Sequence, residues 1–327
     1  MISVNLSAAN EGEYSSPINA DTLGGYSAEE YVRQALPLGV EFGGTGATNA
    51  KDAKKNLGVR AVARNLLDNS DFTNPVNQRG VTNADTVGYC IDRWMLAHSG
   101  KGGYNVDERG AFLYNYENGH YADFIQIIDR HERFTGKVMT FAVKYVHNDP
   151  YNEDILILNF TFGEYKVQEF VEGIQLIHFN GDRVHIRHTQ TDWSGAFKWA
   201  ALYEGEYTAE TLPEYQPKGY AAELAECRRY YRHFNPYEGA WIGSIASGIA
   251  YISIDLSDSP MRVAPSIASG GCLYMCWNGG EGASTSVVTI HKSRKSLITL
   301  KCYTSAAVYG NCSCSNYDIP LGLSADL

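Results

Sequence analysis

The sequence predicts a mainly β protein, and three observations support this. The chain is rich in glycine and tyrosine, with 32 and 23 residues among 327, while charged residues make up 20%. Its apolar residues occur in short, often alternating runs, the period of a strand with one buried face. Glycine, asparagine and aspartate turn signals separate these runs. The length allows two or three small domains, each with a core.

The polar segment 1–36 is expected to be a separate N-terminal segment. Ser27 is a plausible N-cap, followed by Ala28, Glu29 and Glu30. The segment has too little apolar area to fold alone, so it is expected to need partner chains.

A glycine-rich connector is expected at 37–64. Its sequence predicts a tight turn and a short helix from Asn49 to Leu57, closed by Gly58 as C′ residue. A phosphate loop would need a lysine directly after the last glycine, and Lys51 does not fit this spacing. A dinucleotide fingerprint fails as well, because its third glycine would fall at Asn49. Nucleotide binding is therefore not expected.

Residues 65–218 are expected to form a jelly-roll β-sandwich. The signal Asn180 to Asp182 predicts a hairpin in which Asn-Gly supplies the positive φ. Short strands with turn signals between them are typical of this architecture. The predicted strands are Val138–Val146, Ile155–Phe162, Ile174–Phe179, Arg183–His188 and Ala196–Tyr203.

A linking helix is expected at 219–235, because apolar residues recur at helical spacing from Ala221 to Phe234. Its basic residues are interpreted as complementing the C-terminal helix dipole. They are Arg228, Arg229, Arg232 and His233.

Residues 236–327 are expected to form a second, smaller β-domain. In its first strand, Ile252, Ile254 and Leu256 share one face, and Tyr251 lies on the other with its polar neighbours. The predicted strands are Ile249–Leu256, Thr285–Ile290 and Ser296–Tyr303.

The net charge of −10 argues against binding nucleic acid or an anionic membrane surface. The chain has no run of 18 apolar residues and no basic-then-apolar leader, so we expect no membrane insertion and synthesis in a cytosol. The seven cysteines are expected to be reduced. The spacings of Cys272 with Cys276 and of Cys312 with Cys314 differ from a zinc ribbon.

Other motifs for chemistry are also absent or badly spaced, so the sequence predicts no enzyme and no cofactor. His185 and His188 are three apart in a predicted strand and so point to opposite faces, which favours polar-face histidines over a metal cluster that includes His178. The stretch Gly243 to Gly248 does not match G-x-S-x-G. Calcium ligation is conceivable at Asp68, Asn69 and Asp71, but a strand-entry turn accounts for them without a metal.

Several stretches resemble the β-sandwich repeated in tail-fibre and receptor-binding proteins of bacteriophages and prophages. The resemblance covers roughly residues 20 to 234. It lies in Asn65–Phe72, Asn77–Gly80, Tyr89–Trp94, Ala201–Gly205 and Glu223–Tyr231, and in a connector-like stretch at Pro37–Asn49 and Ala53–Gly58.

The resemblance implies a virion tail-fibre protein, assembled in the host cytoplasm, that binds a polysaccharide or other glycan on the host surface. It also implies that residues 1–36 are a shaft or attachment segment. A homotrimer joined to other tail or baseplate proteins, and a sandwich similar to carbohydrate-binding modules, are implied as well. Three weak sites on one fibre would act multivalently. The alternatives are a secreted, non-viral glycan-binding adhesin and a polysaccharide depolymerase. The missing leader speaks against the first, and the lack of a long repeat speaks against the second.

The receptor site is predicted at the tip, residues 236–327, because aromatic rings stack on sugars and this region combines them with glycine loops. The best single spot is the loop after Trp277, where an aromatic residue stands beside polar residues and glycines. Trp94, Trp193 and Trp199 are assigned to the sandwich instead, with Trp94 in its core. The candidate glycan-binding residues are Trp241, Tyr251, Tyr274, Trp277, Asn278, Tyr303, Tyr309 and Tyr317.

Overall fold

The structure is a computed structural model, and it divides into two compact units, Met1–Ala61 and Val62–Leu327. It describes residues 22–23, 26–27, 44–58, 63–147, 152–170, 175–235, 241–269, 273–277, 281–284, 287–304, 309–316 and 321–326. The predicted mainly β fold is confirmed. No helix among these residues is long and apolar enough to cross a membrane.

The first unit contains a short antiparallel pair, β1 (Thr22–Leu23) with β2 (Tyr26–Ser27), and the helix α2 (Ala50–Asn56). Asn49 caps this helix, because its Oδ1 accepts the backbone N–H of Asp52 at 2.9 Å. Gly58 has φ +66°, as expected for a C′ residue. The predicted short helix is therefore confirmed. Ser27 lies in β2, and the segment after it lies outside the described residues.

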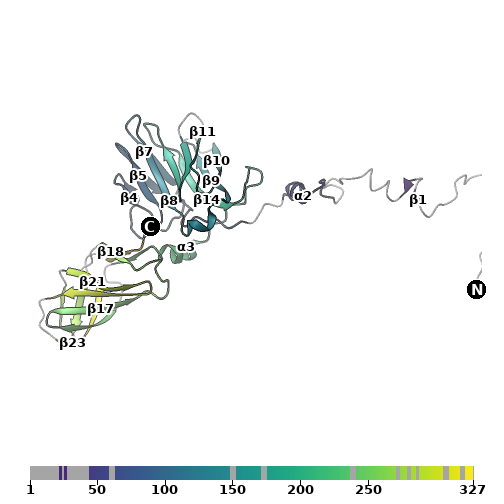
Figure 1. Ribbon diagram of the computed structural model, residues 1–327. Coiled ribbons are helices and arrows are strands. Elements are labelled where there is room, and N and C mark those ends of the chain that lie inside the picture. Colours follow the sequence, from purple (N-terminus) through teal and green to yellow (C-terminus); the bar gives the residue numbers. More distant parts are fainter. Residues whose placement is uncertain are drawn as a thin grey trace, which may run out of the picture. The chain divides into compact units, whose positions relative to one another are not determined.

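The sandwich consists of two six-stranded antiparallel sheets, and several of its strands are labelled in Figure 1. The first has the order β10-β9-β14-β7-β6-β3 and the second β11-β12-β13-β8-β5-β4. The first comprises β3 (Asn83–Ala84), β6 (Gly102–Asp107), β7 (Gly110–Asn115), β9 (Val138–Val146), β10 (Glu153–Thr161) and β14 (Ala196–Glu204). The second comprises β4 (Gly88–Tyr89), β5 (Met95–His98), β8 (Ala122–Ile127), β11 (Lys166–Phe170), β12 (Gln175–Asn180) and β13 (Arg183–His188).

The chain repeatedly crosses between the two sheets, at β3–β4, β5–β6, β7–β8, β8–β9, β10–β11 and β13–β14. A short 3₁₀ helix, His131–Phe134, precedes β9. One core lies between the sheets, and Trp94 is fully buried in it, as predicted. Its ring stacks on Phe124 with centroids 4.8 Å apart, and its Nε1 donates to the carbonyl of Asn69 at 2.9 Å.

The predicted hairpin between β12 and β13 is confirmed, but its turn lies one residue later than the Asn-Gly interpretation requires. Asn180 pairs with Arg183, so the loop consists of Gly181 and Asp182. Gly181 has φ +68°, whereas Asn180 has the extended backbone of a strand end. The register therefore places His178 directly opposite His185.

The predicted helix after the sandwich ends earlier than expected. Helix α3 covers Tyr220–Cys227, and Tyr231–Phe234 is the strand β15. The expectation of helix to residue 234 is therefore wrong. An aromatic-rich segment fits a pleated surface well, and here β15 gains a ladder with β24 (Leu321–Ser324) at the far end of the chain.

The helix-dipole interpretation of the basic cluster is also replaced, because three of its residues face carboxylates. Arg229 pairs with Glu226 at 3.1 Å, and the buried Arg232 reaches Asp258 at 2.8 Å. Arg228 lies 4.0 Å from Asp258.

The C-terminal residues form a seven-stranded sheet and a three-stranded sheet around a second core. The larger has the order β20-β19-β23-β16-β17-β22-β21, and the smaller β15-β24-β18. The larger comprises β16 (Trp241–Ala246), β17 (Ile249–Asp255), β19 (Leu273–Trp277), β20 (Glu281–Ser284), β21 (Val287–Arg294), β22 (Leu297–Tyr303) and β23 (Tyr309–Asn316). The smaller adds β18 (Ser266–Ser269).

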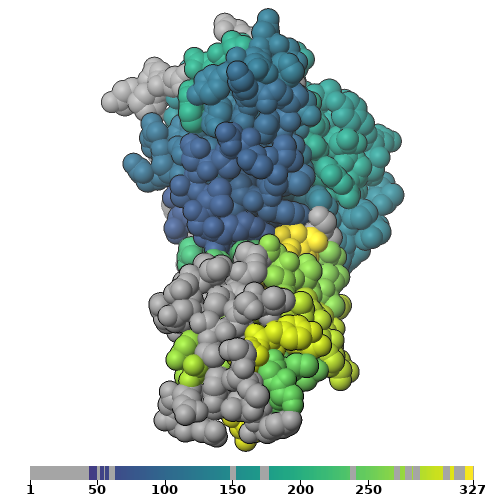
Figure 2. Space-filling model, turned by 90° about the vertical axis from the view of Figure 1, so that its left-hand side faces the viewer, coloured from purple at the N-terminus to yellow at the C-terminus, as the bar shows by residue number. Residues whose placement is uncertain are grey.

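The alternation predicted for β17 is confirmed. Ile252 and Ile254 are buried, while Ser253 and Asp255 are exposed and Tyr251 is half-buried. The strand thus has one face toward the second core and one face outward. In Figure 2 the yellow residues at the end of the chain lie against the blue residues of the sandwich. This agrees with the ion pair between Asp326 and Arg79.

Candidate functional site

Three of the predicted tip tyrosines have side chains that the structure describes on the outward face of the large sheet. Tyr251 on β17 lies opposite Lys301 on β22, and Tyr303 follows two residues later on the same face. Tyr274 lies in β19, where it pairs with Ser284 of β20. Tyr303 is 41% exposed, and Tyr251 and Tyr274 are half-buried.

Tyr251, His291, Lys301 and Tyr303 form a continuous group that we call the tip face. The Tyr251 and His291 rings meet edge to face at 4.7 Å. The ammonium of Lys301 lies 4.9 Å from the ring centroid of Tyr303. A hydrogen bond with Tyr303 raises the pKa of Lys301, so this amine stays charged at neutral pH. The tip face therefore combines aromatic rings with a cation.

The other predicted site residues are less informative. Trp241 is half-buried, packs against the second core and meets Phe234 edge to face at 5.3 Å, so its ring belongs to the fold rather than to the tip face. The backbone of Trp277 pairs with Glu281 and that of Tyr309 with Ala246, but their side chains are outside the described part of the chain. Asn278 and Tyr317 lie outside the described residues altogether.

The sandwich has an aromatic group that the sequence did not single out. Tyr114 of β7 contacts Tyr116 at 5.1 Å and Trp193 at 4.5 Å between ring centroids. Tyr116 and Trp193 are 54% and 37% exposed, so they offer ring surface to solvent. We call these three residues the sandwich aromatic patch. No local sequence pattern could have revealed this patch, because its three rings are spread over 80 residues of sequence. An isolated β-bridge between Tyr114 and Trp193 brings them together in the fold.

The three histidines that the sequence places on a polar face are all buried. His185 and His188 do have separate partners: Nδ1 of His185 lies 3.0 Å from Oδ2 of Asp123, and Nε2 of His188 lies 2.7 Å from the carbonyl of Asp192. The His178 ring instead stacks on His185, with centroids 4.0 Å apart. Burial and the neighbouring His185 lower the pKa of His178 to about 4, so it is neutral at physiological pH.

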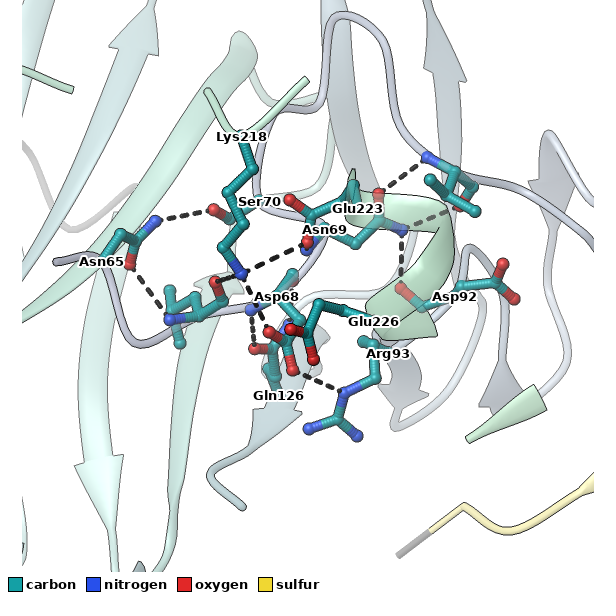
Figure 3. Close-up of polar contacts among 12 residues, drawn as sticks. Asn65, Asp68, Asn69, Ser70, Asp92, Arg93, Gln126, Lys218, Glu223 and Glu226 are labelled. Atoms are coloured by element: carbon teal, nitrogen blue, oxygen red, sulfur yellow. Dashed lines mark hydrogen bonds and ion pairs between the residues drawn. The ribbon is translucent and has the colours of Figure 1, made fainter. Parts of the chain in front are cut away.

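The motif Asn65–Phe72, which carries much of the family resemblance, forms a buried polar network with helix α3 (Figure 3). Asp68 accepts from Lys218 at 3.0 Å and pairs with Arg93 at 3.3 Å. Glu223 of α3 accepts the backbone N–H of Asn69. Burial alone would raise the pKa of Asp68, but the two cations outweigh it and the pKa is lowered.

The residues considered for calcium already have protein partners. The Asn69 side chain bonds the backbone of Val76 and the carbonyl of Asp92. Asp71 accepts from Thr73. Together with the cations on Asp68, these bonds make the group a structural turn rather than an ion site.

A second motif, Asn77–Gly80, connects the sandwich to the C-terminal strands. Arg79 donates to Asp92 at 2.7 Å, pairs with Asp326, and stacks on Tyr231 at 3.8 Å. Gln78 bonds Asp92 and the carbonyl of Tyr231. These residues therefore connect the sandwich to the C-terminal strands through side-chain contacts.

Of the four cysteines considered for zinc, only Cys276 and Cys312 have described side chains, and Cys272 lies outside the described residues. Cys312 is buried in the second core, whereas Cys276 pairs with Ser313 and Gly282, one register position away. Successive strand positions face opposite sides of a sheet, so Cys276 and Cys312 point away from each other. Among the described residues, five cysteines are free thiols, namely Cys90, Cys227, Cys276, Cys302 and Cys312.

Comparison with known proteins adds no assignment, since the chain matches no family model and no curated protein. The functional argument therefore rests on the residues themselves.

Proposed function

We propose that this chain is a receptor-binding protein of a phage or prophage tail fibre, which attaches to a glycan on the host surface through its C-terminal domain. The main observation that supports this proposal is the tip face. Tyr251 and Tyr303 offer ring surface for sugar C–H groups, and Lys301 offers a donor and a positive charge beside them. The open outward face of a sheet suits an extended polysaccharide better than a small molecule that needs a deep pocket.

Further support comes from the contacts made by the motifs that resemble tail-fibre proteins. Residues of these motifs make contacts within the sandwich, with helix α3 and with the last residues of the chain. Such joints would hold a receptor-binding domain firmly on its support. A secreted adhesin would need a similar surface, and a depolymerase would need paired carboxylates across a cleft. The tip face offers aromatic rings and a cation, which are groups suited to binding a glycan.

Replacing Tyr303 by alanine in the full chain should weaken adsorption to host cells or to a glycan array. A stacking ring that acts as a hot spot contributes about 1–3 kcal/mol, and about 1.4 kcal/mol corresponds to tenfold in affinity. Tyr251→Ala should act in the same direction. Multivalency would amplify either loss on intact fibres. The measurement is the dissociation constant for array-identified glycan, with circular dichroism to verify folding.

The matched control is Tyr116→Ala, which removes an exposed ring from the sandwich aromatic patch. It should leave binding unchanged. If Tyr116→Ala or Trp193→Ala abolishes binding while Tyr303→Ala and Tyr251→Ala do not, the sandwich is the glycan site and the tip proposal is wrong.

We further expect the chain to be a homotrimer. The described elements of the first unit are two-residue strands and a seven-residue helix, which are too short to be stable alone. Light scattering should give three times the 36.2 kDa chain mass. A monomeric mass that persists across micromolar concentrations would contradict this expectation.

A further inference from the structure

The outward face of the second sandwich sheet brings together three side chains of metal-ligand type. The hairpin register sets His178 of β12 directly opposite His185 of β13, and β8 on the other side of β13 supplies Asp123. One potential ligand atom from each residue lies within 4.8 Å of the other two. The neighbours Val184 and Ile186 of His185 belong to the core, so this cluster lies on the opposite side of the sheet.

Two atoms of the cluster are buried without a partner. Nε2 of His185 and Oδ1 of Asp123 have no hydrogen-bond partner within the described part of the chain. Asp123 and His185 are only 1% and 6% exposed. Leaving a buried polar atom unsatisfied is costly, and such atoms in native proteins call for an explanation.

The second atoms of the same residues are well oriented. Oδ2 of Asp123 lies 3.0 Å from Nδ1 of His185 and also accepts from Arg187. When Nδ1 carries the proton that Asp123 accepts, Nε2 presents a lone pair. The 3.0 Å separation of Oδ2 and Nδ1 is also close to that of two ligand atoms on one zinc ion, so an ion can replace this proton.

We propose that His178, His185 and Asp123 form a binding site for one first-row divalent transition-metal ion, with zinc as the representative ion. Two imidazoles and a carboxylate are a ligand set that suits zinc and its neighbours in the series, whereas calcium and magnesium prefer oxygen ligands. The ion would take the place of the proton between Nδ1 of His185 and the carboxylate of Asp123, and it would cross-link β8, β12 and β13. The three ligands lie in strands rather than loops, which preorganises the site.

Sequence spacing could not show this site directly. His178 and His185 are separated by the turn, and the tempting pair His185 and His188 has the wrong strand parity. Once the loop is known to be Gly181 and Asp182, counting outward from it pairs 178 with 185. Asp123 comes from a strand more than 50 residues earlier, and no local pattern marks it.

The test is zinc binding by the full chain, by competition with a chromophoric chelator and by the visible absorption of bound cobalt. We expect one site per chain, and a rise of the thermal midpoint with zinc, because a ligand that binds the native state stabilises it. His178→Ala and His185→Ala should each weaken binding by at least about tenfold. His178→Asn, which keeps a polar side chain of similar reach, should do the same and guards against loss by misfolding.

Two further variants complete the test: one is expected to strengthen zinc binding, and the other is a control that should leave it unchanged. Arg187→Gln removes a positive charge that lies next to the proposed ion, so it should strengthen zinc binding, whereas a variant that merely damages the fold would weaken it. His147→Ala removes a half-buried histidine that pairs with Asp154 elsewhere in the sandwich, and it should change nothing. Absence of zinc binding, or binding that survives both His178→Ala and His185→Ala, would overturn the proposal.

Discussion

Asp68→Asn is expected to lower the free energy of unfolding by about 3–5 kcal/mol, the usual cost of removing one partner of a buried ion pair. The variant leaves Arg93, whose side chain is 1% exposed, without its carboxylate. Arg93 would keep its bond to the carbonyl of Ile127 and its stacking on Tyr230, but its charge would be uncompensated. Lys218 is 25% exposed and can turn toward water, so it should contribute less to the loss.

Urea denaturation of the full chain measures this effect, with intrinsic tryptophan fluorescence as the signal. The matched control is Asp107→Asn, which breaks an exposed pair with Arg109 that joins Oδ2 and Nη2 at 2.6 Å. Exposed pairs contribute about 0–1 kcal/mol, so this variant should stay close to the wild type. If both variants lowered the free energy of unfolding by similar amounts, the buried Asp68 network would contribute no more to stability than an exposed ion pair.

The strands could be predicted because their signals are local. Val138–Val146 and Arg183–His188 have the predicted bounds, and the alternation at Tyr251 to Asp255 matches the burial of β17. Period-two alternation and turn residues are properties of short windows, which a single sequence displays directly.

Features that depend on distant pairing were missed or misjudged. The helix stops at Cys227 because Tyr231–Phe234 pairs with a strand about 90 residues later, and helical spacing alone does not reveal that partner. The pairing of His178 with His185 needed the true position of the turn. Trp241 was proposed as a site residue on its chemistry, but its strand parity directs it toward the second core.

The resemblance motifs illustrate a related point about function. Asn65–Phe72 and Asn77–Gly80 identify the family resemblance, and aspartate, asparagine and arginine in such motifs could have marked a ligand site. Instead, Asp68, Asn69 and Arg79 bond other parts of the same chain. Residues with polar chemistry and an internal partner stabilise a joint, so the binding surface has to be sought where rings and charges face solvent.

The contacts of Arg79 with Asp92 and Asp326 predict that the stability of the protein depends on pH. Burial raises the pKa of Asp92 to about 6, although Arg79 acts to lower it, and burial also raises the pKa of Asp326. A raised carboxyl pKa means that the fold favours the protonated form. The contribution of Asp92 to stability is therefore fully present below its reference pKa of 3.8 and is lost as the pH rises through about 6.

Arg79→Gln should raise both carboxyl pKa values further, because it removes the cation that the two ionised groups share. The loss in free energy of unfolding should be about 3–5 kcal/mol at pH 8, where two buried carboxylates would be left unpaired. It should be smaller at pH 5, where both can protonate, by about 1.4 kcal/mol for each unit of additional pKa shift. Urea denaturation at the two pH values measures the difference.

Lys137→Gln, which breaks an exposed pair with Glu204, serves as the control and should show little dependence on pH. If the loss from Arg79→Gln were equal at both pH values or larger at pH 5, Arg79 would not be holding Asp92 and Asp326 in their charged forms, and its part in the joint would reduce to packing against Tyr231.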